Sequence, residues 1–173
     1  MAHALPTDNP WIEQTDYSRE SIIAALRDER DLPTAEIAAA TLYADLLIPD
    51  ILALLERVQH DDLDVPSDRL LFRGIHILGA GRVSAAYRPL VAFLRGPQDR
   101  VETLLGDAIT ENLSEILAGM FDGDEGPLCE LIVDASVGPF VREATLAAAG
   151  AVSYHSPYGT HNPWRQTTES RRF

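Results

Sequence analysis

The sequence contains no lysine, a single cysteine and no long apolar run, and each absence excludes a class of protein. All 14 basic residues are arginines, which excludes a phosphate-binding P-loop because that loop needs a lysine. Cys129 alone can form neither an internal disulfide nor a zinc site with several cysteines. The most apolar windows stop short of the roughly 18 residues of a membrane span, and the N-terminus lacks a secretory-signal pattern. A cytoplasmic, reducing compartment is therefore the default expectation.

The charge balance restricts the partners. Aspartate and glutamate number 27, and the net charge is −13. Nucleic acids are bound mainly by basic side chains that neutralise phosphates, and anionic membrane surfaces attract basic segments. The composition therefore argues against nucleic-acid and membrane partners and favours a protein partner with a basic patch.

From Ser18 onward, apolar residues recur at helical spacing. Ser18 and Ser67 are predicted N-caps, and stretches such as "TENLSEILAGMF" are predicted to form single helices. The best strand candidate, "LCELIV" at 128–133, fits a short buried helix at least as well. The sequence therefore predicts an all-α fold of about eight or nine helices, each of roughly 9–15 residues.

A weak internal repeat suggests how these helices are arranged. "ILGAG" at 77–81 is followed by "ILAGM" at 116–120 and "LAAAG" at 146–150, at spacings of 39 and 30 residues. In this register Pro89-Leu90 matches Pro127-Leu128. Such spacings are typical of two-helix repeats, so we expect a right-handed α-solenoid, a HEAT-like stack of antiparallel helical hairpins. The small residues in these stretches are predicted to let helix backbones approach closely, and they include Gly79, Ala80, Ala118, Gly119 and the residues 147–150.

The stretch "DGDEG" at 122–126 is the strongest candidate for a metal-binding loop. An EF-hand needs oxygen ligands at positions 1, 3 and 5, glycine at 6 and glutamate at 12. Counting from Asp122, the last three positions are occupied by Gly126, Pro127 and Val133. Three requirements fail, so we interpret the stretch as a turn between two helices, with Pro127 beginning the second helix.

No other pattern predicts a catalytic residue, a cofactor or a metal. "GAGRVS" at 79–84 lacks the third glycine of a dinucleotide fingerprint and ends a helix. His76 is interpreted as a partly exposed helix residue, and the acids after His60 as a solvated connector. Cys129 lies near a predicted helix N-terminus that could lower its pKa, but a small buried apolar residue is the better interpretation.

The stretch "LLGDAITENLSEILAGMFDGDEGPLCELIVDASVGPFVREATLAAAGAV" resembles a bacterial family of unassigned role, domain of unknown function 1186. "SRESIIAALRDERDLP" and "LLFRGIHILGAGR" are similar to it too, so the resemblance runs from about Ser18 to Val152. It implies an α-solenoid of HEAT-like hairpins and no established activity. Some members continue through further helices to a cysteine-rich zinc segment. This chain lacks those cysteines, so the resemblance does not imply zinc.

Both ends of the chain fall outside this helical region of residues 18–152. Residues 1–17 contain Pro6 and Pro10 without periodicity and are predicted to be a loosely ordered leader. Residues 153–173 carry three arginines and one glutamate, whereas residues 1–152 carry 11 arginines and 26 acids. We expect residues 153–173 to be a disordered or non-native ending. The alternative is a terminal segment whose Trp164 covers the last repeat.

These features favour a non-catalytic helical-repeat protein that acts as a protein-interaction or scaffold module. The candidate partner-binding residues are the charged members of the family-like segments: Asp107, Glu111, Asp122 and Arg142. Each also has a structural interpretation. Asp107 and Glu111 would flank a helix start, Asp122 would make the turn, and Arg142 would bridge adjacent repeats.

Two other functions stay open at this point. One is a metal-dependent enzyme or weak cation-binding protein, in which His76, Cys129 or the acids at 60–64 and 122–125 converge in a groove. The other is a scaffold that self-associates through its last helix. No sequence feature identifies the partner or the pathway.

Overall fold

The computed structural model describes residues 18–28, 32–60 and 63–155, which contain helices and no strand. The all-α prediction is confirmed. The described residues form ten α-helices and two 3-10 helices: α1 (Arg19–Arg27), α2 (Thr34–Leu42), η1 (Ala44–Leu46), α3 (Ile48–Arg57), α4 (Val65–Ala80), η2 (Ser84–Ala86), α5 (Tyr87–Leu94), α6 (Gln98–Leu105), α7 (Ala108–Glu111), α8 (Leu113–Met120), α9 (Gly126–Val133) and α10 (Pro139–His155).

The helix starts follow local capping signals. The Ser18 hydroxyl accepts a hydrogen bond from the Ser21 N–H at 3.2 Å, which confirms Ser18 as the N-cap of α1. The predicted cap at Ser67 is wrong. Asp64 caps α4 instead, because its carboxylate accepts the Ser67 N–H at 3.0 Å and Pro66 fits the first turn that follows. The hydrogen bonds from Ser67 hold the pKa of Asp64 below its ordinary value.

Helix lengths depart from the predicted range of 9–15 residues. Helix α4 has 16 residues, α10 has 17 and α7 only four. The single helix predicted for "TENLSEILAGMF" is interrupted at Asn112, whose φ of −132° ends α7 before α8 begins. The strand candidate at 128–133 is helical, with Leu128 and Leu131 buried at a helical spacing of three.

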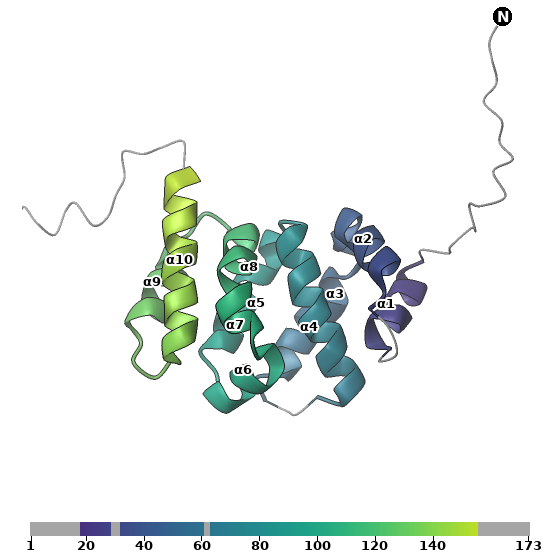
Figure 1. Cartoon of the computed structure of the whole chain (residues 1–173), viewed down its shortest axis with the longest axis horizontal. Helices are drawn as coiled ribbons and strands as arrows, with labels where there is room; N and C mark the ends of the chain where they lie inside the picture. The colour runs from purple at the N-terminus through teal and green to yellow at the C-terminus, as the bar shows by residue number, and fades with distance from the viewer. Residues whose placement is uncertain (1–17, 29–31, 61–62, 156–173) are drawn as a thin grey trace, which may run out of the picture.

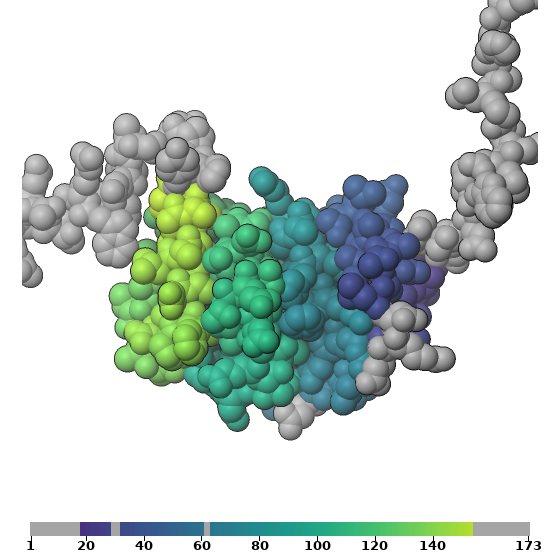
Figure 2. All heavy atoms as spheres, viewed as in Figure 1, coloured from purple at the N-terminus to yellow at the C-terminus, as the bar shows by residue number. Residues whose placement is uncertain are grey.

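The helices pack in two layers that follow the chain order. In one layer α4 packs against α8, and α8 against α10; in the other, α3 packs against α5, and α5 against α9. Contacts of α3 with α4 and of α9 with α10 join the layers, while α1 and α2 pack on α4. The chain therefore advances along the long axis of the molecule, from α1 and α2 at one end to α9 and α10 at the other (Figures 1 and 2).

Helices α4 and α8 approach each other through glycines, as the repeated small residues predicted. A β-carbon on Gly119 would overlap the carbonyl oxygen of Gly79, and one on Gly79 would lie 3.1 Å from the Ile116 Cα. The prediction does not extend to every small residue. A β-carbon on Gly150 would meet open space, and Ala80 is exposed.

A single apolar cluster runs from α1 to α10 and includes Ile22, Ile75, Leu117 and Ala148, all fully buried. None of the described helices combines the length and apolar character that crossing a membrane would need. Helix α10 extends to His155, three residues past the predicted boundary. The predictions for residues 1–17 and 156–173 lie outside the described residues.

Candidate functional site

The "DGDEG" stretch connects α8 to α9 and is closed by its own aspartates. The Asp122 carboxylate accepts the Asp124 N–H at 2.9 Å, and the Asp124 carboxylate accepts the Gly126 N–H at 2.9 Å. Gly123 has a φ of +97°, which glycine adopts without strain. These are two successive Asx turns, and the interpretation of the stretch as a helix-to-helix turn is confirmed.

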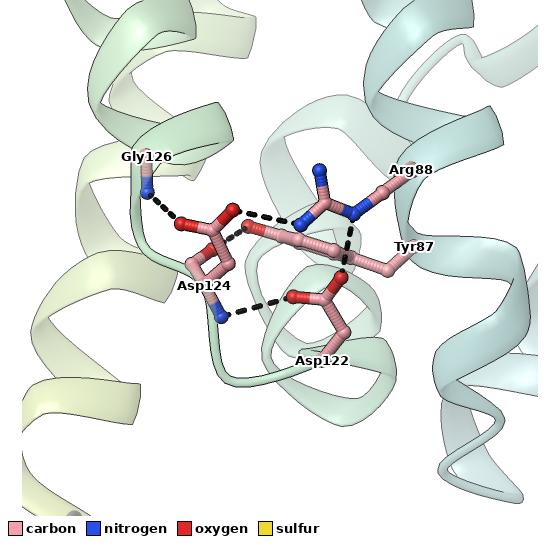
Figure 3. A network of polar contacts seen from close by, with 5 residues as sticks. All are labelled: Tyr87, Arg88, Asp122, Asp124 and Gly126. Atoms are coloured by element: carbon pink, nitrogen blue, oxygen red, sulfur yellow. Dashed lines mark hydrogen bonds and ion pairs between the residues drawn. The ribbon is translucent and has the colours of Figure 1, made fainter.

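Arg88 from α5 holds both aspartates of this turn (Figure 3). Its Nε lies 2.9 Å from an Asp122 carboxylate oxygen and its Nη2 lies 2.7 Å from an Asp124 carboxylate oxygen. The neighbouring Tyr87 hydroxyl donates a hydrogen bond to the Asp124 carbonyl at 3.0 Å. The positive charge facing these two carboxylates is therefore a guanidinium supplied by the protein.

The network shifts the pKa values of its members. The Gly126 N–H and then the Arg88 guanidinium hold the pKa of Asp124 below its ordinary value. Hydrogen bonds to Asp124 and Asp122 raise the pKa of Arg88. Burial raises the pKa of Tyr87, and the charges of Asp122 and Asp124 raise it further. Asp124 is thus ionised and Tyr87 is neutral at neutral pH.

Replacing Arg88 by methionine is expected to raise the pKa of Asp124 part of the way toward its ordinary value of 3.8, because the Gly126 hydrogen bond remains. A carboxyl group whose pKa is lower in the folded protein than in the unfolded chain stabilises the fold at pH values above the unfolded-state pKa. This stabilisation is lost as the pH falls through the pKa of the folded state. The variant should therefore lose less stability than the wild type when pH is lowered below about 4. Carboxyl NMR titration and urea unfolding at several pH values measure both effects.

The control for this prediction is Arg95→Met. Arg95 pairs with Glu130 at 2.6 Å and does not contribute to the pKa of Asp124. An Asp124 pKa that is the same in Arg88→Met, Arg95→Met and the wild type would contradict the pairing.

A groove of about 460 Å³ lies between α2, α4 and α8. Helix α4 packs against both other helices and supplies half of the lining residues, so it forms the central wall. The apolar lining includes Leu32, Ile37, Phe72, Ile77 and Ile116. A concave, mostly apolar surface with a few polar groups is the usual form of a binding site.

Arg73 lines the groove, and one nitrogen of its guanidinium is engaged by backbone carbonyls. Its Nη1 donates to the carbonyl oxygens of Leu26 and Asp28, both at 3.0 Å, at the C-terminal end of α1. Burial lowers the pKa of Arg73, with a further contribution from the nearby Arg69. Arg73 therefore fastens α1 to α4 through its Nη1.

Three other polar side chains of the groove keep unused groups. The His76 Nδ1 lies 2.8 Å from the Phe72 carbonyl oxygen, which can only accept, so Nδ1 carries a hydrogen and Nε2 is left for a further contact. The ring packs on Phe72 at a centroid distance of 4.6 Å. Within the described part of the chain, no hydrogen bond or ion pair engages the side chains of Asn112 and Glu115. His76 is half-buried in a helix, as predicted.

None of the four predicted partner-binding residues lines this groove. Asp107 is exposed and precedes α7, where its carbonyl accepts the N–H groups of Thr110 and Glu111 while its side chain makes no cap bond. Glu111 is exposed at the end of α7, one residue before Asn112 of the groove. Asp122 makes the turn described above.

Arg142 lies half-buried on α10, and its role stays a prediction. Hydrogen bonds from Ser136, and then the charges of Arg95 and Arg142, hold the pKa of Asp134 below its ordinary value. Within the described ranges the buried Arg142 Nε has no hydrogen-bond partner.

The described residues proposed for an enzyme are not brought together in the groove, and Asp61 and Asp62 lie outside the described residues. His76 lines the groove and Cys129 does not. Cys129 is half-buried, and burial followed by the charges of Glu125 and Asp124 raises the pKa of its thiol, opposite to the effect expected from a helix N-terminus. Across the described ranges, no group of three or more His, Cys, Asp or Glu side chains is placed to hold a metal ion.

Sequence reasoning missed Arg88, Tyr87 and the groove. Arg88 and Tyr87 come directly before Pro89-Leu90, which the repeat register aligned with Pro127-Leu128 just after the turn. That alignment indicated that α5 and α9 are equivalent, and their contact is observed. The groove had no such signal, because its lining comes from three separate segments.

Residues 18–154 match the family described as "Protein of unknown function (DUF1186)". The chain belongs to this family. The match includes all ten described α-helices except the last residue of α10, so the DUF1186 sequence pattern covers the groove and the Arg88 network together.

Two curated relatives are similar to this DUF1186 protein. An "Uncharacterized protein" of Chlamydia trachomatis serovar D is 28% identical over 144 residues, covering 81% of this chain and 55% of the relative. An "Uncharacterized protein" of Chlamydia muridarum is 29% identical over 125 residues, covering 70% of this chain and 49% of the relative. The chain spans about half the length of these relatives. No solved structure matches it.

Proposed function

We propose that this DUF1186 protein is a non-catalytic helical-repeat module that binds another protein through the groove between α2, α4 and α8. The groove carries the proposal, because it combines apolar walls with unused polar groups on His76, Asn112 and Glu115. The partner presents a basic patch, and nucleic acid and membrane are not targets, since the net charge is −13. The setting is cytoplasmic.

We further propose that the two layers are those of a right-handed, HEAT-like solenoid. One repeat unit is the hairpin of α4 with α5, and the next is the hairpin of α8 with α9. Helix α10 follows them. Two observations support this equivalence: Gly79 and Gly119 meet where α4 packs on α8, and Leu90 and Leu128 are both fully buried on α5 and α9. Each such pair buries its apolar stripe against the next, as repeat stacking requires.

Exposed apolar side chains at the same end of the molecule also support a partner surface. Leu32 lines the groove and is 66% exposed. Leu42 and Tyr43, next to Thr41 of the groove, are 80% and 61% exposed. Large exposed apolar side chains gathered beside a groove typically mark an interaction site. Glu111 would lie at the edge of this surface, whereas Asp107, Asp122 and Arg142 are weaker candidates.

Site-specific photo-crosslinking tests the proposed function. A photoreactive phenylalanine analogue at Leu32 is expected to capture a protein from a lysate of the encoding organism, and the same analogue at Leu146 is not. Leu146 is the matched control, because it is a similarly exposed leucine (59%) on α10. The capture should be competed by added wild-type protein and by Leu146→Arg, but at least tenfold less well by Leu32→Arg.

Equal capture by the analogue at Leu32 and at Leu146 would contradict binding through the groove. So would competition by the Leu32→Arg variant that is as strong as competition by the wild-type protein. Circular dichroism of the two arginine variants should match the wild type, since both positions are exposed and such changes rarely alter stability by more than about 0.5 kcal/mol.

A further inference from the structure

We infer that the groove receives an amphipathic α-helix of the partner, whose apolar side chains pack on Ile37 and Phe72 and whose arginine or lysine pairs with Glu115. The inference rests on the proposed function and specifies its partner. Two properties of the described residues lead to it: the shape of the trough, and the kind of hydrogen-bonding groups that the trough leaves unused.

The shape favours a helix over an extended peptide. The described residues contain no strand, so they offer no sheet edge to which an extended peptide could be added. The trough is instead bounded by α2 and α8 on either side of α4. Its α4 wall runs from Phe72 to Ala80, about 12 Å at 1.5 Å per residue. Apolar anchors at positions i, i+4 and i+7 of a ligand helix span a similar length.

The unused groups favour a basic ligand. The exposed Glu115 carboxylate is an acceptor, and the Asn112 amide provides an acceptor oxygen and an NH2 group. The Arg73 Nη1 is engaged by carbonyl oxygens at the C-terminal end of α1. Among the described lining residues, Glu115 is the carboxylate without an ion-pair partner, and a guanidinium or ammonium group supplies the opposite charge.

The test uses the full chain and two synthetic helical peptides of about four turns. Both carry leucine at the i, i+4 and i+7 positions, and they differ only in whether the flanking positions are arginine or glutamate. Fluorescence anisotropy is expected to show binding of the arginine peptide and weaker binding of the glutamate peptide. Exposed ion pairs contribute about 0.2–1 kcal/mol. Glu115→Gln should therefore lower the affinity for the arginine peptide by up to about fivefold.

The decisive controls are a variant that reverses the charge at Glu115 and a pair of variants that place arginine inside or outside the groove. Glu115→Arg should reverse the preference, so that the glutamate peptide binds better than the arginine peptide. Leu32→Arg should remove binding of the arginine peptide, and Leu146→Arg should leave it unchanged. An unchanged preference in Glu115→Arg, or equal loss of binding in both leucine variants, would overturn the inference.

The outcomes also separate this inference from the proposed function. If neither peptide binds but the Leu32 crosslink still captures a protein, the partner does not use a basic helix, and the proposed function stands. If neither the peptides nor the crosslink reports binding, both are wrong. If an apolar dye binds in the groove and no helical peptide displaces it, the site accepts small molecules, and the helix inference fails.

Discussion

Replacing Gly119 by alanine is expected to lower the free energy of unfolding by about 2–3 kcal/mol, although alanine is the better helix former. The added β-carbon would overlap the backbone carbonyl of Gly79. A backbone atom cannot rotate away as a side chain can, so α4 and α8 must separate. For a domain of this size, the melting temperature should fall by roughly 4–12 °C.

Gly150→Ala is the matched control for this prediction. Gly150 also lies inside a helix, but its β-carbon would meet open space. The same substitution there should raise stability by up to about 1 kcal/mol through helix propensity alone. Thermal and urea unfolding of the two variants give the measurement, and changes of the same sign would contradict the close approach of α4 and α8.

The glycine contact also bears on the groove. Gly79 and Ile116 both line it, and both lie where α4 meets α8. A separation of these two helices would change the width of the groove between them. Gly119→Ala should therefore weaken partner binding even at temperatures where the variant remains folded, whereas Gly150→Ala should not.

Replacing Tyr87 by alanine is expected to cost about 3–5 kcal/mol of stability, as large aromatic deletions in cores do. The Tyr87 side chain is fully buried, and its ring meets Phe121 edge-on at a centroid distance of 5.7 Å. Its hydroxyl also donates to the Asp124 carbonyl. Tyr87→Phe keeps the ring and removes only this bond, so it should cost about 0.5–1.5 kcal/mol.

Urea unfolding at neutral pH measures both substitutions, and Tyr43→Ala is the control. Tyr43 is 61% exposed after α2, so its truncation should change stability by less than about 0.5 kcal/mol. A Tyr87→Ala effect no larger than that of Tyr43→Ala would show that the α8–α9 turn does not depend on α5. A Tyr87→Phe effect as large as that of Tyr87→Ala would place the energy in the hydroxyl instead of the ring.

Helices were predictable from the sequence where one local signal dominated. Ser18 caps α1 as the sequence predicted. The prediction failed where two signals competed. Asp64 and Ser67 both fit a cap, and the choice depended on how Pro66 enters the first turn.

The candidate sites were much less predictable. Asp122 was recognised as a turn residue, but its partner Arg88 lies 34 residues earlier on another helix. The groove likewise joins Leu32, His76 and Glu115 from three segments. A pairing between distant segments leaves no period or spacing in the sequence, because it depends on which helix faces pack together.

By itself, the sequence determined the all-helical class, the turn at 122–126 and the glycines through which two helices meet. These properties depend on backbone preferences and on apolar spacing within a single segment. Only the tertiary structure decided that α2 and α8 flank α4 with a groove between them, and that Arg88 neutralises the two aspartates of the turn. The reason is physical: side chains from distant segments become neighbours only once the helices have packed.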